Sequence, residues 1–142
     1  MSNLTLNHTV EKFTRTVFNS VIERISVLMS EKNLSFSQFA ALHIVDQTKS
    51  ITIQKISARL NLSLSATSRL VDGLVKIDFL NRIEDQKNRR SKLLTLTQQG
   101  QSFLNKLSAE RVKIIRSNAK ALPEKVSNNF LNAVGLNKKG KI

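Results

Sequence analysis

Small hydroxyl-bearing and basic side chains gather between positions 63 and 76 of this 142-residue chain. They are Ser63, Ser65, Thr67, Ser68, Arg69 and Lys76. Hydroxyl and guanidinium groups of this kind hydrogen-bond to base edges and phosphates in the major groove of DNA. The same composition also fits an ordinary solvated helix face, so these residues alone leave both interpretations open.

A helix must present these side chains. Ser63 can cap it, because its hydroxyl can accept a hydrogen bond from an unpaired N–H group of the first turn. Ala66, Leu70, Leu74 and Ile77 recur every three or four residues, which predicts that they form one buried stripe. The polar face is expected on the other side: Ser65, Ser68, Arg69, Asp72 and Lys76.

Two short apolar-rich runs follow this helix, at residues 80–84 and 92–96. They bracket residues 85–91, which contain no apolar side chain. A strand, a loop and a strand in this order predict a β-hairpin with a long, basic tip. From that tip we expect Lys87, Arg89 and Arg90 to meet phosphates and the minor groove beside the helix.

A shorter helix is expected before the polar one. Thr52 can cap it, Ile53 and Ile56 supply its inner face, and a tight corner around Asn61 joins the two helices. Helix, turn, helix and basic hairpin are the layout of a winged helix-turn-helix. In that layout the second helix enters the major groove and the hairpin reaches the adjacent backbone.

The chain resembles the MarR family of bacterial transcription regulators. Residues 67–74, Thr-Ser-Arg-Leu-Val-Asp-Gly-Leu, are similar to the core of the family's recognition helix. Residues 94–100, Leu-Thr-Leu-Thr-Gln-Gln-Gly, match the ending of its wing motif. The likeness extends over residues 8–136 and is most specific between positions 63 and 100.

Two positions depart from the family pattern. Asp78 stands where a Gly usually ends the recognition helix in a left-handed conformation, which Asp tolerates better than most residues. Asn88 stands where the wing motif begins with Asp, so it can offer Arg90 only a neutral hydrogen bond. The second departure makes the wing more positive and puts its rigidity in question.

The charge is unevenly distributed along the chain. The 23 basic and 10 acidic residues give a net charge of +13. Residues 1–85 hold ten basic and eight acidic side chains, whereas residues 86–142 hold thirteen and two. This asymmetry favours a polyanionic partner, with nucleic acid ahead of an anionic membrane. Without Tyr or Trp to stack on bases, double-stranded DNA is the better expectation.

The length fits one domain, and a hydrophobic content of 40% argues against disorder. From the layout above and the resemblance we expect mainly α structure with a small β-wing, an α+β fold. The expected first helix carries a second apolar face, Phe18, Ile22 and Met29, which needs an additional neighbour. That neighbour is either another subunit or the chain's own core. The resemblance implies a homodimer built by helices within residues 8–31 and 98–136. These flank a winged helix-turn-helix at 35–97, and a basic tail at 137–142 follows.

Several kinds of site are excluded. Without cysteine there is no disulfide, thiol switch or cysteine-ligated metal, and His8 and His43 cannot by themselves build a typical zinc site. No glycine-rich loop could cradle a phosphate, and the serines lack a partner base for covalent catalysis. We therefore expect neither an enzyme nor a cofactor. We also expect a cytoplasmic protein, because no signal peptide or bilayer-spanning apolar run is present.

Three functions remain open on the sequence. The first is a dimeric, sequence-specific repressor that binds an inverted-repeat operator and is released by a small aromatic or anionic ligand. The second is an architectural or anti-silencing DNA-binding protein with low sequence specificity, which the strongly basic C-terminal segment favours. The third is a winged-helix protein that binds another regulator, and the basic wing argues against it.

Overall fold

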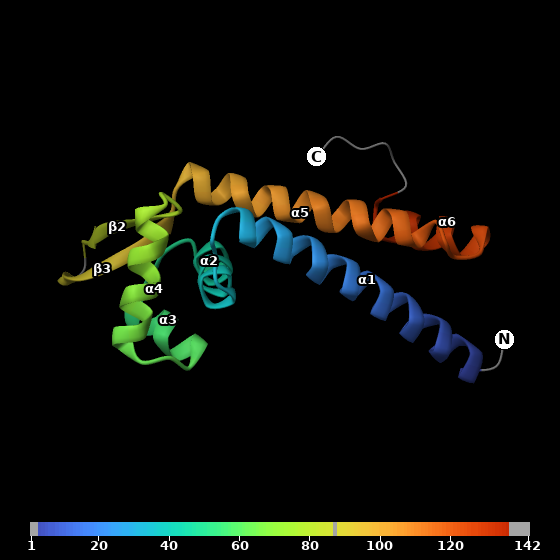
Figure 1. Ribbon diagram of the computed structural model, residues 1–142, viewed down its shortest axis with the longest axis horizontal. Helices are drawn as coiled ribbons and strands as arrows, with labels where there is room; N and C mark the ends of the chain where they lie inside the picture. Colours follow the sequence, from blue (N-terminus) through green and yellow to red (C-terminus); the bar gives the residue numbers. More distant parts are fainter. Residues whose placement is uncertain (1–2, 87, 137–142) are drawn as a thin grey trace. The chain divides into compact units, whose positions relative to one another are not determined.

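The computed structural model describes residues 3–86 and 88–136, with side chains for residues 8–86 and 92–136. Figure 1 shows the order of the elements. They are α1 (Asn3–Glu31), α2 (Phe36–Thr48), β1 (Ile51–Thr52), α3 (Ile53–Leu60), α4 (Leu64–Lys76), β2 (Leu80–Asp85), β3 (Asn88–Leu96), α5 (Gln98–Ala119) and α6 (Glu124–Ala133). This is the expected mainly α fold with a small β-wing.

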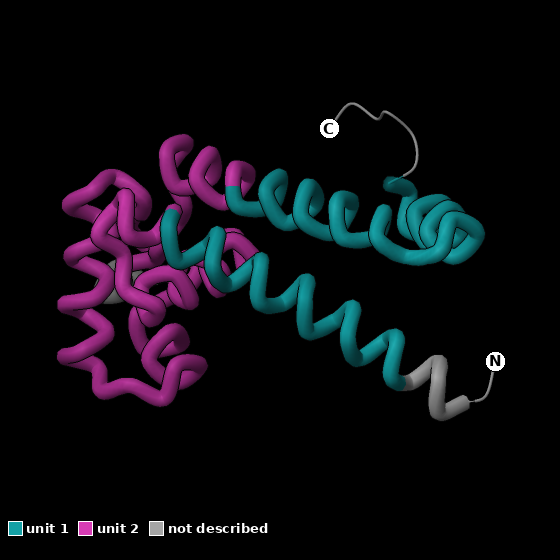
Figure 2. The backbone as a smooth tube through the Cα atoms, turned by 45° about the vertical axis from the view of Figure 1, so that its right-hand side comes forward, with its two compact units in different colours: residues 1–27, 107–142 teal, residues 28–106 magenta. Residues whose placement is uncertain are grey.

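The chain divides into two compact units, coloured separately in Figure 2. Residues 28–106 form the winged unit, which holds α2, α3, α4, the three strands and the adjoining ends of α1 and α5. Residues 1–27 and 107–142 form the helical unit, built from the rest of α1, the rest of α5 and α6. Each unit has its own packing.

The sheet of the winged unit has three antiparallel strands in the order β1-β3-β2. Its register pairs Ile51 with Leu94 and Leu80 with Leu96. Ile51, Leu80 and Leu94 are buried, so the inner ends of all three strands reach the core. The hairpin of β2 and β3 is thereby anchored at the end nearest α4 (Figure 1).

Apolar side chains from every helix of the winged unit form its core. Leu42 of α2, Ile56 of α3 and Leu74 of α4 have no exposed surface. Phe79 follows α4 directly and lies against Phe103 of α5, with ring centroids 5.1 Å apart. Aromatic packing at this distance holds the start of α5 against the end of α4.

Side-chain caps begin α2 and α3, and the cap of α3 confirms the one expected at Thr52. Ser35 and Gln38 form the reciprocal capping box of α2, each side chain bonding the other's backbone N–H. Thr52 caps α3 by accepting a bond from the Lys55 N–H. Asn61 adopts a left-handed conformation, with φ of 52°, and so turns the chain from α3 toward α4.

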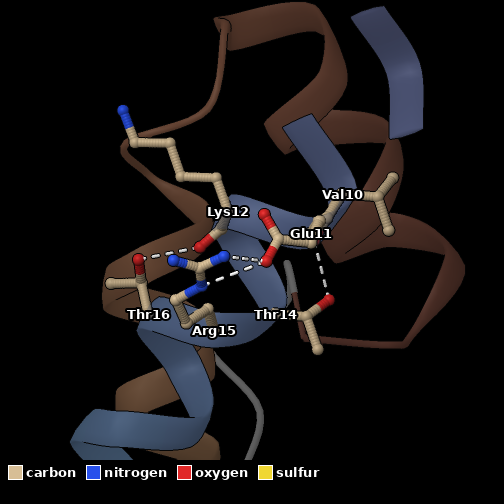
Figure 3. Close-up of polar contacts among 6 residues, drawn as sticks. All are labelled: Val10, Glu11, Lys12, Thr14, Arg15 and Thr16. Carbon is tan, nitrogen blue, oxygen red and sulfur yellow. Dashed lines mark hydrogen bonds and ion pairs between the residues drawn. The ribbon is translucent and has the colours of Figure 1, made fainter. Parts of the chain in front are cut away.

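The helical unit is joined by contacts between distant parts of the sequence. The Phe13 ring of α1 meets the Phe130 ring of α6 edge-on, with centroids 5.6 Å apart. The half-buried Arg24 guanidinium donates from Nε to Oε2 of Glu110 on α5 across 2.9 Å. Closer to the N-terminus the polar bonds of α1 are local, and Figure 3 shows Arg15 paired with Glu11 one turn earlier.

The second apolar face expected on α1 is present in part. Phe18 is 61% exposed and Ile22 is 43% exposed, so the described residues leave both only partly covered. Met29, in contrast, is buried in the winged unit. The expectation was wrong for Met29, because the last turn of α1 belongs to the winged unit's own core.

Candidate nucleic-acid interface

Helix α4 begins as its sequence predicts. The Ser63 hydroxyl accepts a hydrogen bond from the Ala66 N–H across 3.2 Å, and Ser63 itself has an extended backbone. Its oxygen also lies 3.2 Å from the Ser65 hydroxyl. Both serines are exposed, so the first turn of α4 presents two neighbouring hydroxyl groups to solvent.

The polar face of α4 is a continuous exposed stripe. Ser65, Arg69, Asp72 and Lys76 are all exposed, and their spacing of four, three and four residues places them along one side of the helix. Ser68 lies beside this stripe and is half-buried. The face therefore offers hydroxyl groups near the helix start and cations further along, a chemistry suited to base edges and phosphates.

Thr67 does not belong to this surface, which corrects the sequence prediction. Its side chain is fully buried, and its hydroxyl donates to the Ser63 carbonyl oxygen across 2.9 Å. The hydroxyl is thus satisfied inside the helix, and the methyl group packs in the core. Because Thr67 cannot reach a base edge from there, it is not a candidate for DNA contact.

The buried stripe of α4 is displaced accordingly. Thr67, Val71 and Leu74 have no exposed surface, whereas Ala66 and Leu70 are only half-buried. The sequence pattern counted threonine as polar and so centred the stripe one residue early. A threonine that bonds the carbonyl four residues before it behaves as an apolar residue.

Asp78 ends α4 in the left-handed conformation that its position predicts, with φ of 58°. The Asp78 N–H bonds the Val75 carbonyl at 3.0 Å, and the Phe79 N–H bonds the Leu74 carbonyl at 2.9 Å. These are the two bonds of a Schellman motif. The helix end has the usual geometry although the usual Gly is absent.

Thr97 joins the end of α4 to the start of α5. Its hydroxyl accepts a bond from the Gly100 N–H at 2.9 Å and so caps α5. The same hydroxyl donates to the Asp78 carbonyl oxygen at 2.6 Å, and Gln99 Nε2 donates to the Ile77 carbonyl oxygen at 3.1 Å. Two carbonyls at the C-terminal end of α4 are thereby satisfied from α5.

Gly100 is required by the same junction. A Cβ atom at this position would lie 2.3 Å from the Phe79 carbonyl oxygen, well inside contact distance. That carbonyl accepts a bond from the Thr97 N–H at 3.2 Å and is fixed in place. The Leu-Thr-Gln-Gln-Gly sequence therefore positions α4 against α5, a role that its spacing alone did not reveal.

The hairpin is longer and its connection shorter than expected. Strand β2 extends to Asp85 and β3 begins at Asn88, with a change of register at Glu84 and Asp85. The backbone of Arg89 and Arg90 therefore belongs to strand β3 and not to a loop. Polar residues continue the pairing, so hydrophobicity alone marked the strand ends too early. Lys87 and the side chains of Arg89 and Arg90 lie outside the described part.

Ion pairs tie the hairpin together and to α4. Lys92 Nζ on β3 lies 2.9 Å from Glu84 Oε1 on β2. The hydrogen bond and the charge of Lys92 lower the pKa of the exposed Glu84 carboxyl below its ordinary value. Arg82 on β2 pairs with Asp72 on the polar face of α4. The sequence predicts Asp72 on this face but not its partner Arg82. No spacing rule links a helix residue to a strand residue ten positions away.

Other kinds of site find no support in the described residues. Within residues 8–86 and 92–136, His, Cys, Asp and Glu form no group of three that could hold a metal ion. In the described part of the chain, no helix has both the length and the apolar content to cross a membrane.

Comparisons with known proteins point to one family. Residues 34–92 match the model of the MarR family. The HTH-type transcriptional regulator SarZ of Staphylococcus aureus strain USA300 is 23% identical over 94 residues, which cover 66% of this chain and 64% of SarZ. The chain thus spans less than two-thirds of that relative. SarZ is a transcriptional regulator, the class of protein that the sequence leads us to expect for this chain.

Solved structures share the fold over almost the whole chain. The transcriptional regulator Tm0710 of Thermotoga maritima has a TM-score of 0.76 at 18% identity, covering 94% of this chain and 91% of its own. MepR of S. aureus, crystallised as a DNA complex, has a TM-score of 0.71 at 15% identity, covering 85% and 91%. At such identities the likeness shows the winged-helix fold alone, which confirms the expected architecture.

Proposed function

We propose that this chain, whose residues 34–92 match the model of the MarR family, is a member of that family and binds double-stranded DNA as a dimeric, sequence-specific transcriptional repressor. We propose further that a small aromatic or anionic ligand releases it from the operator. The site of action would be the cytoplasm, where bacterial DNA lies.

The observation that carries the proposal is the exposed stripe of α4. Ser65 and Arg69 face solvent near the start of a helix whose opposite side is fully buried. In helix-turn-helix proteins the N-terminal residues of this second helix contact base edges. We assign base contacts to Ser65, Ser68 and Arg69, and backbone contacts to Ser63 and Lys76.

The wing supplies the remaining contacts. We propose that Lys87, Arg89 and Arg90 meet phosphates and the minor groove beside the half-site, as their charge suggests. The Arg82–Asp72 pair supports this proposal, because it links β2 of the wing to the face of α4 that would enter the major groove.

Dimerisation is supported by uncovered apolar side chains in the helical unit. Phe18 and Ile22 of α1, Val126 of α6 and Val134 directly after α6 are each more than 40% exposed. A second copy would cover such side chains in a two-fold arrangement. Two recognition helices related by that axis would read an inverted repeat whose half-sites lie about 10 base pairs apart.

The ligand response is supported by a cleft in the helical unit. This open cleft of about 410 Å³ lies between α1 and α5, and Arg24, Lys113 and Val27 contribute to its lining. Glu23 and Glu110 also line it, and Arg24 is paired with Glu110, so we assign to Lys113, beside apolar Val27, the contact with a small aromatic anion. Thermal-shift measurements with phenolic acids test this part, and a series without any stabilisation would contradict it while leaving DNA binding untouched.

Substitution of Arg69 tests the base-reading role. Arg69→Ala should weaken binding to the preferred duplex by about 1–3 kcal/mol, because a bidentate contact to a base is lost. Binding to random-sequence duplex should change much less. Fluorescence anisotropy with both duplexes measures the two losses, and equal losses would refute the assignment.

An architectural role is the alternative that the basic C-terminal segment favours. The two functions differ in the ratio of specific to non-specific affinity at physiological salt. A repressor should reach a ratio of about a thousand or more, and an architectural protein should fall far below it.

A further inference from the structure

Helix α5 carries a basic stripe that the operator-binding surface does not use. Lys113 and Arg116 lie in α5, and Lys120 directly follows its last residue; their intervals of three and four residues place them on one side of the helix end. They border an open groove of about 250 Å³ whose floor includes Ala109 and Val112. All five residues belong to the helical unit.

No carboxylate neutralises this stripe within the described residues. Some other basic side chains of the two long helices are paired, Arg24 with Glu110 and Lys106 with Glu31, whereas Lys12 and Arg111 form no ion pair with a described residue but stand outside the stripe. Lys113, Arg116 and Lys120 form no ion pair with any residue of the described part. Like charges at helical spacing repel one another, so the arrangement is unfavourable unless an anion offsets it.

Arg116 adds a second, independent observation. Its Nε atom is buried, and no acceptor lies within hydrogen-bond distance. A buried N–H group without an acceptor is rare in folded proteins and indicates a missing partner. The partner must accept hydrogen bonds, and beside Lys113 and Lys120 it would be anionic.

We propose that this α5 stripe is a second nucleic-acid-binding surface, which binds duplex phosphates without reading sequence. From Lys113 to Lys120 the helix rises about 10 Å, which exceeds the reach of one small anion but matches several successive phosphates. The proposal rests on the proposed DNA binding but uses the helical unit in place of α4 and the wing. It also gives a role to positive charge in the C-terminal part of the chain, which binding of an operator through α4 and the wing does not use.

A second copy of the chain fits the stripe less well. The described residues of the helical unit, 8–27 and 107–136, hold eight basic and four acidic side chains. In a two-fold contact centred on the stripe, each stripe would face its own positive charge. A membrane surface also fits poorly, because the groove floor offers no bulky apolar side chain to insert.

The test compares salt dependence of binding to random-sequence duplex. In the triple variant Lys113→Gln, Arg116→Gln, Lys120→Gln, the slope of log affinity against log salt should fall by about 2 to 3, since each lost phosphate contact removes about 0.9. The matched control is Lys12→Gln, Lys32→Gln, Lys125→Gln, three exposed cations elsewhere in the full chain. It loses the same charge and should keep the wild-type slope.

Several outcomes would overturn the inference. Equal salt slopes for the wild type and the triple variant would do so. A salt slope that falls by the same amount in the control variant would also do so. A triple variant that sediments as a monomer would show instead that the stripe is an interface between copies. The charge-preserving Lys113→Arg, Lys120→Arg variant should keep the wild-type slope, which guards against a folding defect. The ratio of operator to random affinity in the wild type separately tests the proposed function.

Discussion

At the scale of single residues, the hydroxyl of Thr97 connects two helices. It caps α5 through the Gly100 N–H and satisfies the Asp78 carbonyl at the end of α4. The side chain is nearly buried, so water cannot replace either partner. The threonine of the Leu-Thr-x-x-Gly motif therefore acts on stability through two bonds at once.

Thr97→Val keeps the shape and removes the hydroxyl. We expect the free energy of unfolding to fall by about 2 kcal/mol, since one cap and one buried acceptor lose their partner. Urea denaturation measures the loss. Thr97→Ser is the control and should retain most of the stability. A valine variant as stable as wild type would contradict the double role.

Two glycines give a matched comparison. Gly100→Ala should destabilise the protein by about 1–3 kcal/mol, because the new Cβ would press on the fixed Phe79 carbonyl. At Gly73 in α4 a Cβ would meet only the movable end of Gln38. Gly73→Ala should therefore be neutral, or stabilising by up to about 1 kcal/mol through helix propensity. Thermal unfolding measures the stability of both variants. A Gly73→Ala variant less stable than the Gly100→Ala variant would contradict a close approach of Gly100 to the Phe79 carbonyl.

Helix caps could be predicted, because a short sequence rule exists for them. Ser35, Thr52 and Ser63 cap their helices because hydroxyls accept bonds from first-turn N–H groups, and that geometry depends only on nearby residues. Thr67 could not be placed in this way. Its orientation depends on the packing of α4 against the core, and a threonine suits either side of a helix.

At the scale of elements, the relation between α4 and the wing matters most for the proposed interface. Strand β2 pairs with β3 along its length, with a change of register between Glu84 and Asp85, and Arg82 links β2 to Asp72 of α4. The pair is partly exposed, with 35% and 54% of the two side chains accessible. We infer that it orients the wing and adds only modestly to stability.

A double-mutant cycle with Asp72→Asn and Arg82→Gln measures that contribution. The coupling free energy in urea unfolding should be about 0.2–1 kcal/mol, as for other exposed ion pairs, and should shrink as salt is added. A coupling of zero would mean that the two side chains do not interact in solution.

The elements themselves were predictable, and their ends less so. Apolar periodicity and caps located the helices of the winged unit, because both signals are local. The hairpin was predicted too short, because Asp85 pairs with Asn88 although neither is apolar, and residues 88–91 carry no apolar side chain to signal a strand. The Arg82–Asp72 contact was missed since it depends on how strand and helix meet in space.

At the scale of the whole molecule, the proposal requires two copies. Phe18 and Ile22 are exposed on α1 and, in our account, are covered by the partner subunit. The sequence indicated this surplus of apolar surface but could not tell a second subunit from an internal core. That distinction depends on the exposure of individual side chains.

Phe18→Glu combined with Ile22→Glu should shift the protein from dimer to monomer, because two charges would be buried in the interface. Sedimentation velocity measures the shift, and circular dichroism checks that the helices persist. Phe36→Glu is the control, since Phe36 is 71% exposed in the winged unit and a charge there should leave the dimer intact. Unchanged sedimentation of the double variant would argue against this interface.

Selection of bound fragments from random duplex DNA, followed by titration at physiological salt, tests the central claim most directly. The account predicts an inverted repeat with half-sites about 10 base pairs apart, bound about a thousandfold or more tightly than random duplex. Recovery of no common sequence, with equal affinity for every duplex, would contradict a sequence-specific repressor.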